Sequence, residues 1–225
     1  MTMIKIAFIS DTHDEQRDLI VPPCDILCIS GDYTKIGAAR EYIPFYNWLE
    51  NQTQVKHKVF IEGNHELQAD TKDGIRQFYA TAYHAQWLAD LEARKESFKE
   101  HNIHRLFNSE VVIEGIKFWG SPYTLAFYNW AFNMVEEELK GNWEQMPLDT
   151  DILLTHGPPL NHMDLCPNGH RAGDPWLMQK ILQVRPKVHS FGHIHEQNPN
   201  KTEIHVQGEK KVLLINSAMV NDDYS

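Results

Sequence analysis

Short apolar runs rich in β-branched residues alternate with stretches of helical periodicity along the chain, and this alternation leaves few folds open to it. The stretches 38–51, 75–98 and 175–184 place apolar residues at helical spacing. Strands that alternate with helices predict an α/β protein whose sheet is at least partly parallel. The expected strands are 4–9, 26–29, 59–61, 111–119, 152–154, 188–191 and 212–215.

The length of the chain, 225 residues, suits one large α/β domain. No internal repeat, Gly/Ser-rich linker or long block of like charge divides it, so we expect a single domain over residues 1–225. Residues 68–108 have helical character and lie between two of the polar motifs described below. We therefore expect them to form a helical insertion.

The charge of the chain is acidic, with 21 Lys and Arg against 31 Asp and Glu and a formal net charge of −10. General attraction to nucleic acids or anionic membranes is therefore not expected. The opening residues lack a basic region followed by a long apolar stretch, and no apolar run reaches about 18 residues. These features predict a cytoplasmic protein without a membrane anchor.

The cysteines are Cys24, Cys28 and Cys166, an odd number in a chain of ordinary size. A disulfide framework is not expected from such a set. Cys24 and Cys28 have the spacing of one strand face, which favours buried thiols over metal ligands.

Five of the expected strands are followed directly by side chains that bind metal ions. Each motif alone has a simpler structural interpretation, such as a helix cap beside a surface histidine or polar residues on an exposed strand. Together they follow strands at the edge where an α/β sheet gathers its ligands, which predicts a mixed oxygen and nitrogen metal cluster. The motifs are Asp11-Thr12-His13, Gly31-Asp32, Gly63-Asn64-His65-Glu66, Thr155-His156-Gly157 and Gly192-His193-Ile194-His195.

The order of these motifs closely resembles that of the calcineurin-like metallophosphoesterase superfamily, and the motifs extend from residue 11 to residue 195. The resemblance implies an α/β/β/α fold, in which two packed mixed β-sheets are flanked by helices. It also implies two divalent metal ions bridged by one aspartate. We expect manganese first, with iron, zinc or magnesium as alternatives.

The same resemblance assigns roles to individual residues. Asp32 would bridge the two ions and take part in catalysis, and Asn64 and His65 would contact the substrate. His65 would lie near the leaving oxygen and stabilise charge or donate a proton there, the alternative being a hydrogen-bonded structural histidine. The first ion would be held by Asp11, His13, Asp32 and His195, and the second by Asp32, Asn64, His156 and His193.

The chemistry of this ligand set agrees with the assignment. Two divalent ions can lower the pKa of a shared water and orient the resulting hydroxide for in-line attack on phosphorus. Two ions, two aspartates and one hydroxide leave a net charge of about +1, because Asn64 and the imidazoles are neutral. Glycines at 31, 63, 157 and 192 can let the chain approach a substrate closely, although ordinary turns would also use glycine.

A closer resemblance is to the metallophosphoesterase-domain-containing (MPPED) family, some members of which hydrolyse phosphodiesters, including cyclic nucleotides. Some relatives have glycine at the position of His193 and are weak catalysts, so the histidine here implies an intact second metal site. The similarity covers nearly everything except 68–108. It includes Gly31-Asp32-Tyr33-Thr34, 63–67, Gly120-Ser121-Pro122-Tyr123-Thr124, Trp130-Ala131-Phe132-Asn133, 151–160 and 185–196.

The serine/threonine phosphatase branch grips a phosphomonoester with arginines that this chain lacks. Tyr33-Thr34-Lys35 and Glu62 occupy those positions, although Lys35 or Arg171 can substitute in part. We therefore predict a phosphodiesterase of small phosphoesters such as cyclic nucleotides. The alternatives are a phosphomonoesterase or protein phosphatase, and a catalytically slow nucleotide- or partner-binding protein.

Three groups of side chains can each be interpreted in two ways. The aromatic residues Tyr123, Phe127, Tyr128 and Trp130 can stack on a base or pack against the sheet. The histidines 84, 101 and 104 are expected to be ordinary surface residues, with a substrate contact as the alternative. The acidic run 136–138 is either the start of a helix or a polar face.

Overall fold

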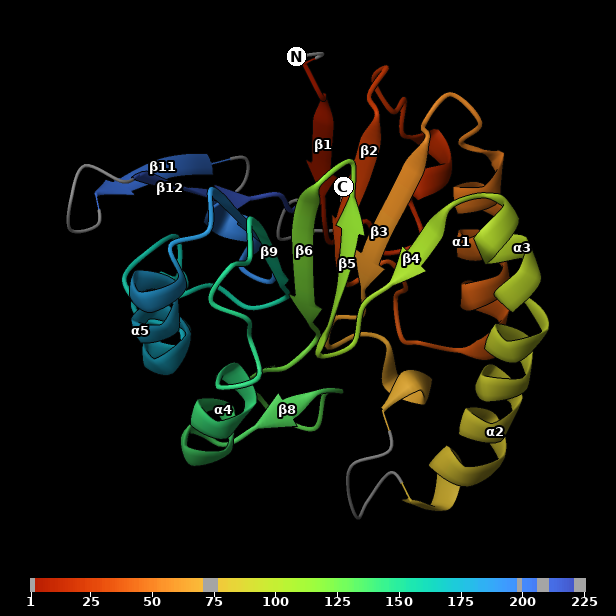
Figure 1. Ribbon diagram of the computed structural model, residues 1–225. Helices are drawn as coiled ribbons and strands as arrows, with labels where there is room; N and C mark the ends of the chain where they lie inside the picture. Colours follow the sequence, from red (N-terminus) through yellow and green to blue (C-terminus); the bar gives the residue numbers. More distant parts are fainter. Residues whose placement is uncertain (1–2, 71–76, 198–199, 206–210, 221–225) are drawn as a thin grey trace.

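The computed structural model describes residues 3–70, 77–197, 200–205 and 211–220, which form two packed β-sheets with helices on their outer faces (Figure 1). The first sheet is wholly parallel and has the order β1-β2-β3-β4. Its strands are β1 (Ile6–Ile9), β2 (Ile26–Ser30), β3 (His57–Ile61) and β4 (Ile103–Arg105).

The second sheet is mixed and has the order β11-β12-β10-β9-β6-β5. Strands β6, β9, β10 and β12 run parallel, whereas β5 and β11 pair antiparallel at the two edges. The bounds are β5 (Ser109–Ile113), β6 (Ile116–Ser121), β9 (Ile152–Thr155), β10 (Val188–Phe191), β11 (Asn200–His205) and β12 (Lys211–Asn216); a separate pair is formed by β7 (Thr124–Leu125) and β8 (Asn133–Met134).

Helices cover the outer face of each sheet (Figure 1). The first sheet carries α1 (Ala39–Asn51), α2 (Gln77–Ala93) and α3 (Lys95–Glu100), and the second carries α4 (Glu136–Trp143) and α5 (Pro175–Val184). Short 3₁₀ turns are η1 (Gln16–Asp18), η2 (Leu67–Ala69) and η3 (His195–Gln197). The predicted α/β fold of two packed sheets flanked by helices is confirmed, and its mixed character lies in the six-stranded sheet.

The core follows the two-residue alternation of the strands. Ile26 and Cys28 of β2 pack toward the second sheet, where they join Phe118 and Leu154, whereas Leu27 and Ile29 belong to the larger cluster under the helices. Every residue of β2 is buried, because both faces of this sheet are covered. Such burial gives the strand ends a rigid support.

The structure corrects four expectations about elements. The stretch 111–119 is not one strand, because Glu114 and Gly115 have positive φ angles and form the two-residue turn of the β5–β6 hairpin. The expected helix 75–98 is divided at Arg94 into α2 and α3, and its residues 75–76 lie outside the described ranges. Cys24 precedes β2 rather than lying on it, while Cys28 is fully buried.

The fourth correction concerns the segment 68–108. It contains α2 and α3 as expected, but Ile103–Arg105 is strand β4, which pairs in parallel with β3 and completes the first sheet. The segment is therefore partly built into the sheet. The acidic run 136–138 forms the exposed first turn of α4, which was one of its two interpretations.

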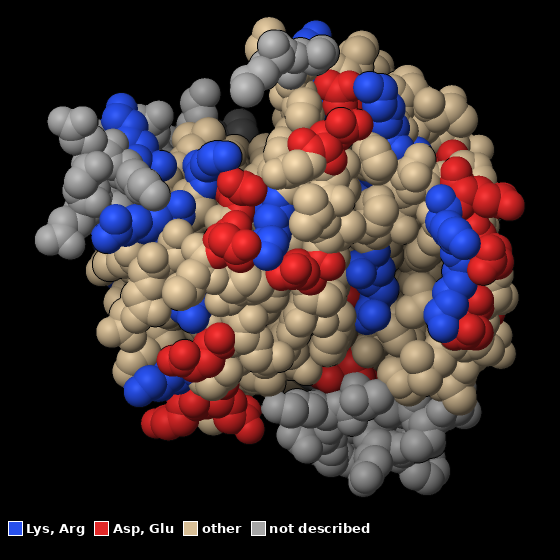
Figure 2. All heavy atoms as spheres, viewed as in Figure 1, with Lys and Arg blue, Asp and Glu red and all other residues tan. Residues whose placement is uncertain are grey.

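The distribution of charged side chains on the surface is compatible with the excess of acidic residues in the sequence. In the view of Figure 2, acidic and basic side chains are interleaved and form no broad basic area. Within the described ranges, no helix is both long enough and apolar enough to cross a membrane.

Candidate metal centre

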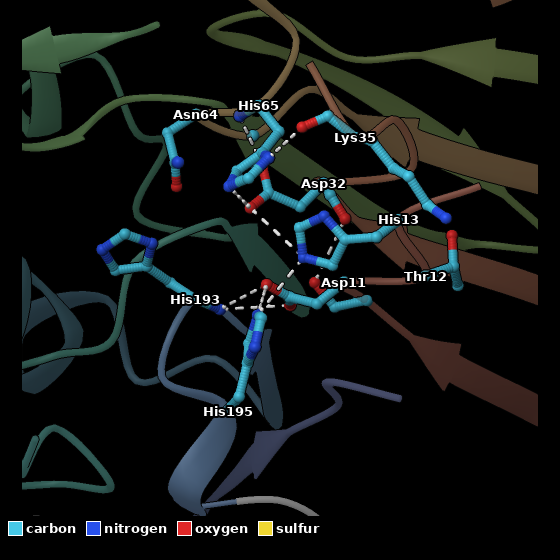
Figure 3. Close-up of polar contacts among 12 residues, drawn as sticks. Asp11, Thr12, His13, Asp32, Lys35, Asn64, His65, His193 and His195 are labelled. Atoms are coloured by element: carbon cyan, nitrogen blue, oxygen red, sulfur yellow. Dashed lines mark hydrogen bonds and ion pairs between the residues drawn. The ribbon is translucent and has the colours of Figure 1, made fainter. Parts of the chain in front are cut away.

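All eight residues singled out from the sequence lie at the carboxyl ends of strands, where the two sheets meet. The loops after β1, β2 and β10 hold Asp11, His13, Asp32 and His193 in the left-handed region, with φ of 52°, 43°, 52° and 69°. Non-glycine residues adopt this region rarely, and they do so most often at functional sites. Figure 3 shows seven of these residues gathered in one place: Asp11, His13, Asp32, Asn64, His65, His193 and His195.

One group of ligand atoms contains Asp11, His13 and His195, which all lie within 4.8 Å of one another. Nε2 of His195 is 3.1 Å from Oδ1 of Asp11 and 3.3 Å from Nε2 of His13. The carboxylate of Asp11 also accepts the backbone N–H of His193, at 3.0 and 3.1 Å. Asp11 therefore fixes the loop after β10 against the end of β1.

A second group contains Asp32, His156 and His193, with the same mutual spacing. Nε2 of His156 lies 3.2 Å from Oδ2 of Asp32 and 2.8 Å from Oδ1 of Asn64. Oδ2 of Asp32 is also 4.0 Å from Nε2 of His13, a member of the first group. Asp32 thus stands between the two groups, where a shared carboxylate ligand would have to lie.

The imidazole rings are oriented by contacts on the side away from the cluster. Nδ1 of His13 lies 3.2 Å from the carbonyl oxygen of Thr34, and Nδ1 of His156 lies 2.9 Å from that of Ser30. A nitrogen facing a carbonyl oxygen carries the proton, so in the neutral rings Nε2 presents its lone pair to the centre. Histidine ligands of metals are held in this way.

The electrostatics of the centre combine charged carboxylates with two neutral imidazoles and one that holds a proton. Burial lowers the pKa of His13 and of His193 to about 4, so both rings are neutral at pH 7. Burial alone would raise the pKa of Asp32, but His156 and His65 bring it well below its usual value. Asp32 in turn overcomes the effect of burial on His156 and raises the pKa of that ring to about 10. A bound divalent cation would compensate the negative charge of the buried carboxylates, the role that the proton on His156 has here.

The donor set fits divalent metal ions. It combines two carboxylates, one amide oxygen and neutral imidazoles, a mixture that manganese, iron and zinc accept. Asp11, Asp32, His13 and His156 are almost completely buried, so their polar atoms have little access to water. Buried ligand atoms that converge in this way are costly without a partner.

A comparison of the sequence with models of protein families matches residues 4–197 to the calcineurin-like phosphoesterase family. The chain belongs to this family. The resemblance predicted from the motif order is thereby confirmed. The matched range includes every one of the expected ligands.

Curated relatives of this chain support the closer resemblance as well. It is 35% identical over 195 residues to metallophosphoesterase domain-containing protein 1 of Homo sapiens, a match that covers 84% of this chain and 59% of the relative. It is 34% identical over 212 residues to a UPF0046 protein of Caenorhabditis elegans, covering 86% of this chain and 52% of that protein. The chain therefore spans a little over half the length of these relatives.

Two solved structures share the fold. A phosphopantetheinyl hydrolase of Mycobacterium tuberculosis matches with a TM-score of 0.58 and 14% identity, covering 98% of this chain and 90% of that one. The protein TT1561 of Thermus thermophilus matches with a TM-score of 0.59 and 14% identity, covering 94% of this chain and 89% of that one. At this level of identity the likeness concerns the fold alone.

His65 adjoins both ligand groups, because its ring forms a third group with His13 and Asp32 whose ligand atoms all lie within 4.8 Å of one another. Its Nδ1 lies 2.5 Å from the carbonyl oxygen of Lys35, and its backbone N–H donates to Oδ1 of Asp32 at 2.8 Å (Figure 3). Its ring stacks on Trp130 with centroids 4.1 Å apart. Its Nε2 is 3.9 Å from Oδ2 of Asp32. The ring therefore presents Nε2 toward the centre from a fixed position.

Two glycines are required by the close approach of chain segments. A Cβ atom on Gly31, whose φ is +96°, would lie 2.7 Å from Cα of Gly63. A Cβ atom on Gly192 would collide with the carboxylate of Asp11. At these two positions the close approach is between segments of the protein itself, so the expected approach to a substrate stays a prediction.

Glu66 has a structural role that the sequence motif did not indicate. Its side chain is fully buried, and Oε2 accepts the backbone N–H groups of Asp32 at 3.0 Å and Gly63 at 2.6 Å. Oε1 accepts the N–H and the hydroxyl of Thr34 at 2.9 and 2.8 Å. This carboxylate joins the loops after β2 and β3. The sequence offered one signal for this role, namely that Glu66 directly follows the expected site residues Asn64 and His65.

A hollow of about 300 Å³ opens over the centre. Phe127 and Tyr128 stand exposed at its rim, and Trp130 packs on His65, whereas Tyr123 is buried against Phe132. Tyr123 therefore packs in the core, as one interpretation expected, whereas Phe127, Tyr128 and Trp130 line the hollow, where a base could stack. The hollow is lined by Asp32, Asn64, His65, Phe127, Tyr128, Trp130, His193, His195 and Glu196.

The remaining candidate histidines lie away from this hollow. Nδ1 of His84 is 2.7 Å from the carbonyl oxygen of Gln68, and that of His101 is 2.9 Å from the carbonyl oxygen of Ser97. His104 stacks on His57. Each is partly exposed and none of the three lines the hollow, which agrees with the expectation of surface histidines rather than a substrate contact.

Proposed function

We propose that this phosphoesterase hydrolyses small phosphodiesters, such as cyclic nucleotides, at a centre of two divalent metal ions. The position of Asp32 between two groups of buried ligand atoms carries this proposal. Manganese is the ion we expect, although the donor set also suits iron or zinc. The ions would be held by Asp11, His13, Asp32 and His195, and by Asp32, Asn64, His156 and His193.

The bound ions would supply positive charge to the phosphate and lower the pKa of a water molecule between them. The side chains have separate tasks. Asp32 holds the two ligand groups at a fixed separation, and Asn64 and His65 face the open hollow, where they would contact phosphate oxygens. The stacking of His65 on Trp130 keeps this contact in place without rotation of the ring.

Charges around the hollow favour a diester over a monoester. Lys35 is paired with Glu15 at 2.7 Å, and Arg171 is paired with Asp164. Glu62 is buried and pairs with Arg105 at 2.6 Å. The carboxylate of Glu196 lines the hollow itself. A phosphodiester carries one negative charge and needs less compensation here than a dianionic monoester.

We assign to His65 the donation of a proton to the leaving oxygen. In its protonated form the ring keeps Nδ1–H on the carbonyl of Lys35 and transfers the Nε2 proton to the departing alkoxide. The variant His65→Gln is then expected to lose about 100-fold in kcat with a poor alkoxide leaving group and less than about tenfold with p-nitrophenolate. Equal losses with both leaving groups would contradict the proton-donor role.

The reaction class is tested by comparing one aromatic diester with its monoester. Bis(p-nitrophenyl) phosphate and p-nitrophenyl phosphate are assayed with the same protein after removal of metal with EDTA and after restoration with Mn²⁺. The proposal predicts hydrolysis that requires added metal and a kcat/KM at least about tenfold higher for the diester. Preference for the monoester would favour a phosphomonoesterase, and no turnover with either would favour a binding protein.

A further inference from the structure

A second and larger hollow of about 690 Å³ adjoins the one over the metal centre. It is bounded by the β7 region on one side and by the loop between β9 and α5 on the other. The two hollows share Phe127, His193 and Glu196 in their walls, so they lie side by side. A volume of this size is typical of sites that take a small molecule, about 300–1,000 Å³.

The walls of the second hollow are largely apolar. Leu125, Ala126 and Phe127 face it from the β7 side, Leu160 and Pro167 from the loop between β9 and α5, and Ile194 from the loop after β10. Phe127 is half exposed and its ring lies 6.2 Å from that of His193, edge to face. An apolar space that begins at an expected metal ligand suits an apolar or planar group attached to the phosphate.

The charges of the second hollow exclude a second phosphate. The carboxylates of Glu136 and Glu196 line it. Its Arg171 is paired with Asp164, whose other oxygen accepts the N–H of Asn161 at 2.8 Å. An anionic substituent would therefore meet two carboxylates and a guanidinium that is already neutralised, whereas an uncharged one would not.

The position of His65 decides which ester substituent extends into this space. His65, Asn64 and Trp130 line the first hollow but not the second. In an in-line displacement the leaving oxygen departs on the side opposite to attack, and we have placed that oxygen at His65. The retained substituent then extends along His193 and Phe127, away from His65.

We propose that, for acyclic phosphodiesters, the second hollow binds the retained, non-leaving substituent, and that this substituent is an uncharged group with a planar apolar body, such as an aryl group. The inference rests on the proposed phosphodiesterase function. The protein would select the alcohol that stays on the phosphate, and metal binding alone does not provide this selectivity.

The test uses two diesters with the same leaving group, phenyl p-nitrophenyl phosphate and methyl p-nitrophenyl phosphate. For each, kcat/KM is divided by the rate constant of alkaline hydrolysis without protein, which removes the difference in intrinsic reactivity. The corrected ratio of phenyl to methyl ester is expected to be about 10 to 100 for the unaltered protein. The variant Ala126→Trp, which fills the hollow from an exposed position, is expected to lower this ratio about tenfold.

A matched control is Ala89→Trp, which places the same side chain on an exposed position of α2 and is expected to leave the ratio unchanged. The variant Phe127→Ala gives a second measurement, because it removes part of the wall and should also lower the ratio through a higher KM for the phenyl ester. A corrected ratio near 1 in the unaltered protein, or a ratio unchanged in both Ala126→Trp and Phe127→Ala, would overturn the inference. Metal-dependent hydrolysis of the methyl ester separates that result from failure of the phosphodiesterase proposal, under which neither ester is cleaved.

Discussion

The variant Asp32→Asn is expected to lose at least about a thousandfold in kcat for a phosphodiester while keeping its fold. The amide has the shape of the carboxylate but no negative charge, so it weakens both ligand groups between which Asp32 stands. Loss of several kcal/mol of transition-state stabilisation corresponds to about this factor. The measurement is kcat with bis(p-nitrophenyl) phosphate at saturating Mn²⁺, together with circular dichroism.

The matched control is Asp149→Asn. The side chain of Asp149 is 72% exposed and is paired with Lys117 on the surface, so its amide is expected to leave kcat unchanged. An Asp32→Asn variant that keeps kcat within about tenfold of the unaltered protein, after contaminating phosphatases have been removed, would contradict the role of Asp32. If Asp32→Asn lost both its activity and its folded structure, kcat would be measured for His156→Ala as the second variant.

The second large effect is expected on stability. Glu66→Gln replaces an acceptor of four hydrogen bonds by an amide whose NH₂ group cannot accept, and this NH₂ would face buried N–H groups of the two loops. The free energy of unfolding is expected to fall by about 2–4 kcal/mol, because buried donors lose their acceptor. Urea denaturation in the presence of saturating Mn²⁺ measures this change.

The same substitution should reduce metal affinity, since the N–H of Asp32 is one of the groups that Glu66 fixes. The control is Glu92→Gln, which alters a side chain that is 67% exposed and paired with Lys95. Its expected effect on the unfolding free energy is below about 0.5 kcal/mol. If Glu66→Gln had no larger effect than Glu92→Gln, the joining of the β2 and β3 loops by this carboxylate would be refuted.

Much of the centre could be predicted from the sequence because its ligands follow buried strands. The carboxyl ends of neighbouring parallel strands lie at the same edge of a sheet, which brings together Asp11 and Asp32 after β1 and β2, whereas the meeting of Asp11 with His195 of the other sheet was implied by the family resemblance. The structure places them 3.1 Å apart. The identity of the fold came from the order of the motifs rather than from periodicity, since short apolar runs do not distinguish one sheet arrangement from another.

The elements that sequence analysis missed depend on local turn geometry or on distant pairing. The turn at Glu114 and Gly115 has isoleucine on both sides, Ile113 and Ile116. The run 111–119 therefore resembled one continuous strand in the sequence. Strand β4 has three residues and gains its place only by pairing with β3. Such contacts leave no periodic signal in the segment itself.

The roles of Glu66 and of the second hollow were missed for the same reason. Glu66 acts on the backbone of Asp32 and Thr34, more than thirty positions away, and no spacing of residue types encodes such a contact. The second hollow combines Phe127, Leu160 and Ile194 from three separate loops. Phe127 was a candidate for stacking on a base, whereas Leu160 and Ile194 carried no signal in the sequence, and only their arrangement in space shows a cavity.

The most direct test of the account is the number of metal ions bound by the unaltered protein. Protein purified without added metal is saturated with Mn²⁺, freed of excess ion by gel filtration and examined by elemental analysis. The account predicts about two divalent ions per chain, counting any metal retained from purification, in keeping with a carboxylate shared by two ligand groups. A value of one or less after saturation with Mn²⁺, and again with Zn²⁺ and Fe²⁺, would contradict the dinuclear centre.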